Sequence, residues 1–381
     1  MVNGSNVLRI VAPFGVVIAV VVLILPLSPA YDLNVFLRAG DAVLHGRDIY
    51  PAIGSPAVYS GFAFVYPAVA VWPFVLLALL PAGLAGAIYF VVCACAVIAA
   101  TTLESDRDHW IPVLVVGTAF TITGLQLGSL SPLLFVGAVC LWKLRDRPVI
   151  FGLVAAPVIV SKLFLAPLLV WPLLAKRYRA FAWATSLTGL LLALSFATGS
   201  LSLTGYLQLL SELGSHEAQA GFGLIGLLRN LSLTPLAAQV IALAVATAVI
   251  VGAYAHYRRV RDERLLYSAG IICALLLTPV LWSHYLVLLP AVLLTLDARR
   301  RWFIALAITS WVIAPPHGLL SAAGVPPSAG SPDSWKRATV KPIRTGTCTA
   351  NTTSESVSTT STPPLTWSRR NAYSIIPAMI V

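Results

Sequence analysis

The chain has 381 residues, of which 58% are hydrophobic and only 10% carry a formal charge. Soluble domains carry about 25% charged residues, so this composition argues against a set of soluble domains and indicates a polytopic membrane protein. The formal net charge of +11 comes largely from Lys and Arg in short turns between apolar runs, such as 143–147, 176–179, 258–264 and 299–301. This placement follows the positive-inside rule, and no basic stripe carries interleaved aromatic residues, so we expect no nucleic-acid partner.

The apolar run from Ile10 to Leu27 has two interpretations. Ser28, Pro29 and Ala30 resemble the small residues of a signal-peptidase site, which would make the run a cleaved signal peptide. We favour an uncleaved first helix, because the rest of the chain is also membrane-embedded. This choice puts the amino terminus in the cytoplasm and the next loop on the outer face.

That loop, residues 31–63, holds three of the chain's fourteen acidic residues, Asp32, Asp41 and Asp48. A carboxylate at a membrane boundary is costly unless it meets water, a partner or a substrate. Between these residues, apolar side chains recur at helical spacing as far as Gly46. The pattern predicts an amphipathic helix on the membrane surface in a loop with a functional role.

Apolar runs then follow one another through most of the chain. They are Phe64–Leu80, Leu84–Leu103, Ile111–Ile122, Leu133–Leu141, Val149–Val160, Leu163–Leu174, Phe181–Phe196, Leu236–Tyr254, Leu265–Leu281, Leu286–Leu296 and Phe303–Ala314. Several are shorter than the roughly 20 residues that span a bilayer, which predicts broken or re-entrant helices. We expect an all-α protein with about ten to twelve crossings. Either Ile111–Ile122 is re-entrant or an earlier helix does not span fully, because the basic turns otherwise fall on opposite sides.

The sequence predicts one transmembrane domain, residues 1–323, followed by a Ser/Thr/Pro-rich tail, residues 324–381. The tail offers too little apolar surface to offset chain entropy, so it is expected to be disordered, or it is a frame-shifted end. If the basic turns are cytoplasmic, Lys162, the polar segment 199–233 and the segment 282–285 join the Asp-rich loop on the outer side.

Polar residues with apolar neighbours are the candidates for chemistry on that side. They are Asp32, Gln126, Lys162, Arg229, Asn230 and His284. One carboxylate with several cations and amides suits a transfer reaction, in which the carboxylate takes a proton from an attacking hydroxyl and the cations stabilise an anionic leaving group such as phosphate. The sequence shows no metal-ligand spacing, and Cys93 and Cys95 are too close for a zinc knuckle, so we expect no metal and no cofactor.

Each candidate also has a structural interpretation. Asp32 could cap the amphipathic helix, and Lys162 could extend to the membrane interface from a short helix end. His284 could accompany Trp282 and the next tyrosine in an interfacial aromatic belt. Gln126 could join helices by hydrogen bonding.

Five motifs together resemble glycosyltransferase family 87, the membrane mannosyltransferases of mycobacteria and their relatives. In chain order they are D-L-N-V-F with G-R-D-I-Y, F-V-Y-P, G-L-Q-L-G-S-L, S-K-L-F-L-A-P and T-P-V-L-W-S-H-Y-L-V-L-L-P. The similarity extends over roughly residues 7–320. It implies a fold of the GT-C type and a polyprenyl-phosphate-mannose donor.

The resemblance also implies residue roles. Asp32 matches the family's acidic residue after the first helix, the expected general base. Lys162, Arg229 and His284 match polar groups near the lipid phosphate, and Gln126 is assigned with them to substrate binding. Tyr66, in the F-V-Y-P motif, is assigned there too.

The implied reaction moves mannose to a hydroxyl of a glycolipid or glycan acceptor, with inversion to an α-mannoside, on the outer face of the plasma membrane. No acid is needed, since a phosphate monoester leaves as an anion. Two alternatives stay open: an arabinofuranosyltransferase of the same fold with a polyprenyl-linked donor, and a transporter or lipid flippase.

Overall fold

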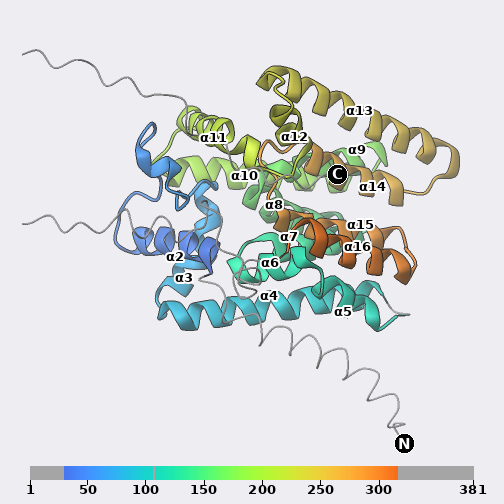
Figure 1. The fold of residues 1–381 in the computed structure, drawn as a ribbon, viewed down its shortest axis with the longest axis horizontal. Coiled ribbons are helices and arrows are strands. Elements are labelled where there is room, and N and C mark those ends of the chain that lie inside the picture. The colour runs from blue at the N-terminus through green and yellow to red at the C-terminus, as the bar shows by residue number, and fades with distance from the viewer. Residues whose placement is uncertain (1–29, 106–107, 316–381) are drawn as a thin grey trace, which may run out of the picture. The chain divides into compact units, whose positions relative to one another are not determined.

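The computed structural model describes residues 30–105 and 108–315, which form helices and connecting segments with no β-strand (Figure 1). The α-helices are α2 (Tyr31–Leu44), α3 (Trp72–Ala78), α4 (Ala82–Glu104), α5 (Trp110–Val116), α6 (Ala119–Leu127), α7 (Ser131–Lys143), α8 (Pro148–Ser161), α9 (Val170–Leu174), α10 (Tyr178–Thr198), α11 (Leu203–Glu217), α12 (Leu224–Asn230), α13 (Pro235–Val260), α14 (Arg264–Leu277), α15 (Leu288–Thr295) and α16 (Arg300–Ile313). The 3-10 helices are η2 (Pro56–Tyr59), η3 (Ala68–Val71), η4 (Leu163–Leu169), η5 (Ala218–Ala220) and η6 (Ser283–Val287). The predicted all-α class is confirmed for these ranges. The predicted first helix and the tail 324–381 lie outside them.

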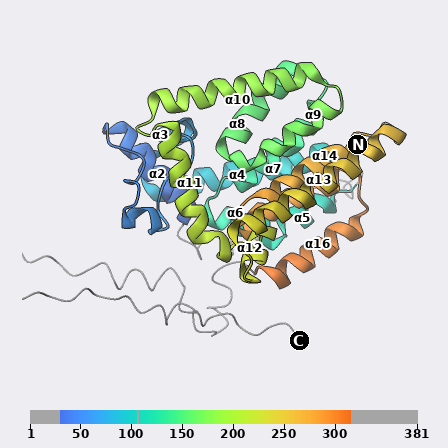
Figure 2. The same cartoon turned by 90° about the horizontal axis from the view of Figure 1, so that it is seen from above.

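Three described helices, α4, α10 and α13, are long and apolar enough to cross a membrane. The helices α5 and α6 meet at an angle of 57°. Together they make a fourth candidate if they form one broken span. Other apolar helices, such as α7 and α8, are shorter than a bilayer span. Figure 2 shows α10 running beside α8, and α13 lies against α14 (Figure 1). The chain is therefore a membrane protein, whereas the ten to twelve crossings stay a prediction.

The predicted amphipathic helix is present as α2, which ends two residues before Gly46. Its buried face meets protein: Phe36 stacks on Phe74 of α3 with ring centroids 4.3 Å apart. Gly40 permits this close approach, since a Cβ at that position would lie 2.8 Å from the carbonyl oxygen of Phe74. The apolar face of α2 therefore packs on α3, and the position of this helix on the membrane surface stays a prediction.

Two other predicted elements differ in the structure. The run Phe64–Leu80 is helical only from η3 to the end of α3, Ala68–Ala78, because Pro67 before it has extended backbone. The polar segment 199–233 is mostly helical, with α11, η5 and α12. Each of the two long helices that flank this segment, α10 and α13, is a candidate span.

Backbone groups at the bend between α5 and α6 form hydrogen bonds with side chains of the bend itself and of α16. Thr118 caps α6, its side-chain oxygen accepting from the backbone N–H of Thr121. Ser310 of α16 accepts from the backbone N–H of Ala119 at 2.9 Å, and Trp311 donates to the carbonyl oxygen of Gly117 at 2.9 Å. The break is thus a stable feature of the helix pair.

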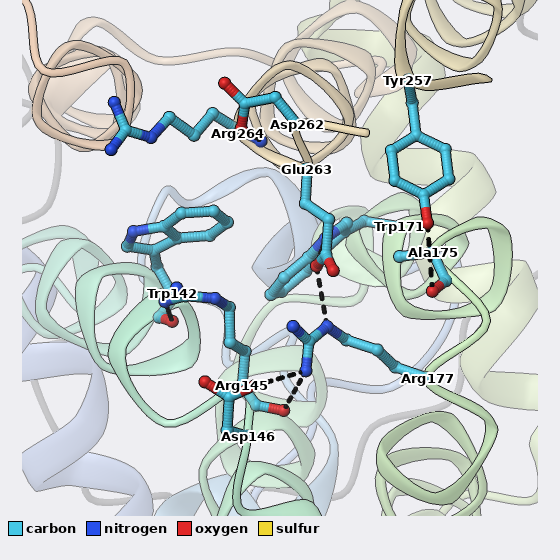
Figure 3. A network of polar contacts seen from close by, with 10 residues as sticks. All are labelled: Trp142, Arg145, Asp146, Trp171, Ala175, Arg177, Tyr257, Asp262, Glu263 and Arg264. Carbon is cyan, nitrogen blue, oxygen red and sulfur yellow. Dashed lines mark hydrogen bonds and ion pairs between the residues drawn. The ribbon is translucent and has the colours of Figure 1, made fainter. Parts of the chain in front are cut away.

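A polar network ties three of the basic turns together (Figure 3). Arg177, in the turn before α10, donates through Nε to Glu263 at 2.7 Å and through Nη1 to Asp146 at 2.8 Å. The same Nη1 donates to the carbonyl oxygen of Arg145, and Trp171 donates to the Glu263 carboxylate. The turns α7–α8, α9–α10 and α13–α14 are therefore joined through one guanidinium.

Candidate functional site

Asp32 lies in the first turn of α2 and faces His284 of η6. The carboxylate Oδ2 and the imidazole Nε2 are 3.9 Å apart, although 252 residues separate them in sequence (284 − 32). Asp32 is not the helix cap, because Ala30 occupies that position and no side chain caps this end. The capping interpretation is wrong, and the first turn of a helix still favours a carboxylate through the helix dipole.

The environment of Asp32 suits a proton acceptor. Burial raises the pKa of its carboxyl from 3.8 to about 6, and the positive charge of Lys162 limits that rise. About a fifth of the side chain, 22%, remains exposed, so a ligand can reach it. A base is most effective when its pKa lies near the working pH, and this carboxyl is closer to that condition than an ordinary aspartate.

Lys162 follows the last residue of α8, at the break before η4. Its ammonium Nζ lies 4.2 Å from the ring centroid of Tyr66 and 4.8 Å from that of Tyr285. Burial lowers the pKa of this lysine to about 8, while the charges of Asp32 and Glu217 act in the opposite direction. Contacts with two rings inside the protein favour a role in the site over an extension to the membrane interface.

Tyrosine rings connect these charged groups. Tyr66 and Tyr285 are both buried, and the rings of His284 and Tyr285 are 4.3 Å apart. The structure therefore brings together four of the six predicted site residues: Asp32, Lys162, His284 and Tyr66. His284 is buried beside Asp32 and Tyr285, which argues against a purely interfacial aromatic belt.

Gln126 is buried in α6, whose end packs on the turn that carries Asp32. At Gly128 the backbone φ is 63°, and a Cβ there would lie 2.6 Å from the Cβ of Leu33. Neither amide atom of Gln126 has a hydrogen-bond partner in the ranges that the structure describes. The expected helix-joining hydrogen bond is thus not seen there, and the amide keeps its full capacity to bind another group.

Arg229 lies in α12, and no hydrogen bond or ion pair with Asp32 or Lys162 is found within residues 30–105 and 108–315. Its Nε is buried and, over the same residues, has no hydrogen-bond partner. One link joins its neighbourhood to the cluster: the backbone N–H of Phe222 donates to the carbonyl oxygen of Leu281 at 2.7 Å, three residues before His284. The structure therefore does not group Arg229 with the other cations.

Two functional candidates were missed from the sequence, Tyr285 and Glu217. Tyr285 was set aside as a neighbour of His284, although its ring contacts the Lys162 ammonium. Glu217 ends α11, and its charge acts on Lys162 and on Tyr31. The only sequence signal for Glu217 is an acidic residue in the polar segment 199–233, which is predicted to lie on the outer side.

The cluster places one carboxylate, one ammonium and one imidazole together at an accessible point. This set can remove a proton from a hydroxyl and hold a negative charge beside it. Among the described residues, no group of three or more His, Cys, Asp or Glu side chains could hold a metal ion.

Comparisons with known proteins support the same class of chemistry. The sequence profile of glycosyltransferase family 87 matches residues 64–283, which include Tyr66, Gln126, Lys162 and Arg229. A search of curated proteins and a search of solved structures gave no match. The match covers 220 of the 381 residues (283 − 64 + 1), more than half of the chain. The chain belongs to glycosyltransferase family 87 and is a membrane glycosyltransferase.

Proposed function

We propose that the protein transfers mannose from polyprenyl-phosphate-mannose to a hydroxyl of a glycolipid or glycan acceptor. The reaction takes place on the outer face of the plasma membrane, in a fold of the GT-C type with ten to twelve crossings. The observation that carries the proposal is the cluster of Asp32, Lys162 and His284 beside the tyrosines at positions 66 and 285. Family membership supports the reaction class.

Asp32 acts as the base in this mechanism. Its carboxylate accepts the proton of the acceptor hydroxyl while the oxygen bonds to the anomeric carbon of mannose. The bond from that carbon to the phosphate oxygen breaks with its electron pair, so polyprenyl phosphate leaves and the configuration inverts. A phosphate needs no proton to leave, which explains why one carboxylate is sufficient.

Lys162 stabilises the phosphate as its negative charge grows. A partly buried ammonium gives strong stabilisation, because the low dielectric around it increases each electrostatic interaction. His284 is proposed as a second donor to the phosphate. Gln126 and Arg229 are proposed to bind more remote parts of the donor, since each has a buried polar atom unsatisfied within the described residues.

The test is sugar transfer by the full chain in lipid nanodiscs, with radiolabelled polyprenyl-phosphate-mannose as donor. We expect Asp32→Asn to lower kcat about 10²- to 10⁴-fold, the usual contribution of a general base. Asp41→Asn is the matched control, because Asp41 is on the same helix but exposed and paired with Arg47 and His45. Equal activity in wild type and Asp32→Asn would remove Asp32 from the mechanism.

The same assay separates the alternatives. Polyprenyl-phosphate-arabinose is offered in a parallel reaction, and preference for it would identify an arabinofuranosyltransferase. Transport is measured separately after reconstitution into proteoliposomes. A protein that transfers neither sugar but moves a solute or lipid across the liposome membrane would be a transporter or flippase.

A further inference from the structure

Glu217 is a carboxylate in a position that helix stability does not explain. It is the last residue of α11, where the partial negative charge of the helix dipole disfavours an acidic side chain. The residue is partly buried, which adds a desolvation cost. No hydrogen bond or ion pair of its side chain is found in the part of the chain that the structure describes.

Glu217 lies within electrostatic range of the same residues as Asp32. Both carboxylates act electrostatically on Tyr31, on Lys162 and on Tyr285, which come from three separate segments. Burial raises the pKa of the Glu217 carboxyl, and the charges of His216 and Lys162 lower it. The site thus contains two carboxylates around one ammonium.

The position of Glu217 is fixed on both sides. On one side, Glu212 accepts from the backbone N–H of Gly54 at 3.2 Å, and the ring of His216 lies 4.8 Å from that of Tyr59. On the other side, the backbone N–H of Phe222 donates to Leu281 at 2.7 Å. Glu217 therefore lies between an attachment to the Asp-rich loop and an attachment to the segment of His284.

We propose that Glu217 forms an acceptor site, in which its carboxylate accepts hydrogen bonds from hydroxyl groups of the acceptor sugar and directs the attacking hydroxyl to Asp32. This inference rests on the proposed function. The donor phosphate is negative and is repelled by a carboxylate, so it belongs on the Lys162 side. Sugar hydroxyls are neutral donors, and an ionised carboxylate offers about four lone-pair sites to them.

The test uses the full chain in nanodiscs, with octyl α-mannoside as acceptor probe and polyprenyl-phosphate-mannose as donor. We expect Glu217→Gln to raise the KM for octyl α-mannoside about tenfold, because a charge-assisted hydrogen bond becomes a neutral one. The kcat and the KM for the donor stay within about twofold, which is the pattern for lost ground-state binding. Glu217→Asp should recover part of the acceptor affinity.

Asp41→Asn is the control, because Asp41 is a carboxylate of the Asp-rich loop that is paired with Arg47 and His45, and it should leave the acceptor KM unchanged. Binding of radiolabelled octyl α-mannoside to wild type and Glu217→Gln is measured in parallel, without donor. An acceptor KM or affinity that is equal in both proteins, or no binding to wild type, overturns the inference. Weaker binding to Glu217→Gln in a protein that transfers no sugar supports the Glu217 site and contradicts the proposed function instead.

Discussion

Arg177 and Lys162 are both partly buried cations next to apolar helices, and their surroundings differ. The guanidinium of Arg177 has two carboxylates within 2.8 Å and a carbonyl oxygen at 3.1 Å. The ammonium of Lys162 contacts two tyrosine rings, and its pKa is lowered by burial. Asp32, one of the acidic residues of the same region, has its carboxylate 3.9 Å from the imidazole of His284.

We propose that this difference separates structural charges from functional ones. Short hydrogen bonds to two carboxylates offset the desolvation of Arg177, so the network in Figure 3 holds three turns in place. Lys162 and Asp32 also lose hydration on burial, and the protein offsets this desolvation cost only in small part. Groups with shifted pKa values and unused hydrogen-bonding capacity are typical of substrate-binding sites.

The largest effect is expected from Arg177→Met. This change leaves the carboxylates of Glu263 and Asp146 without their cation, so the free energy of unfolding should fall by about 3 kcal/mol. The activity of the folded fraction should stay near that of wild type. Thermal unfolding in detergent measures the first quantity and sugar transfer the second; Arg179→Met, an exposed arginine two residues later, is the control. An unchanged unfolding temperature would show that the network is not structural.

Lys162→Met should have the opposite effects, with a loss of transfer activity and no loss of stability. Transfer should fall about 10²-fold, because the phosphate loses a preorganised cation. The unfolding temperature should stay equal or rise, since methionine removes a desolvated charge and keeps the volume. Lys176→Met, in an exposed turn, should alter neither quantity. A Lys162→Met protein with lower stability and normal turnover would place Lys162 with Arg177 as a structural cation.

The pH dependence should report the same two groups. Asp32 must be deprotonated to act as base, so kcat/KM should fall about tenfold per pH unit below a pKa of about 6. Lys162 must be protonated to hold the phosphate, so the rate should also fall above a pKa of about 8. His284, Glu217 and Tyr31 face these groups and are kept in every variant. Lys162→Met should lose the alkaline limb and move the acidic limb to higher pH, because the charge of Lys162 limits the rise in the pKa of Asp32. A flat profile between pH 5 and 9 would contradict both assignments.

Sequence reasoning located α2 well because local signals define it: apolar residues at helical spacing and a glycine after the end. It also found Asp32, Lys162 and His284, because each is a charge or imidazole among apolar neighbours. It could not place Glu217 beside Lys162, since that depends on the path of α11, fixed by contacts as distant as Gly54 with Glu212.

The same limit explains the run Phe64–Leu80. Its apolar composition predicts one long helix, whereas Pro67 and the packing of Phe74 on α2 leave a shorter one. Arg229 remains a prediction. Its expected side of the membrane groups it with the other cations, but a shared side does not by itself bring side chains into contact.

The smallest effect is expected from a buried hydrogen bond between neutral groups, which tests whether such a bond also has a purely structural role. Ser310 of α16 is fully buried and accepts from the backbone N–H of Ala119, at the bend between α5 and α6. Ser310→Ala leaves that N–H without its acceptor, so we expect a loss of about 1 kcal/mol in unfolding free energy and unchanged transfer kinetics. Ser215→Ala is the control, because the exposed Ser215 hydroxyl bonds only to its own helix, at Glu212. If Ser310→Ala lowers kcat but not stability, the bend belongs with the Lys162 region as part of the functional site, since a purely structural hydrogen bond cannot produce that result.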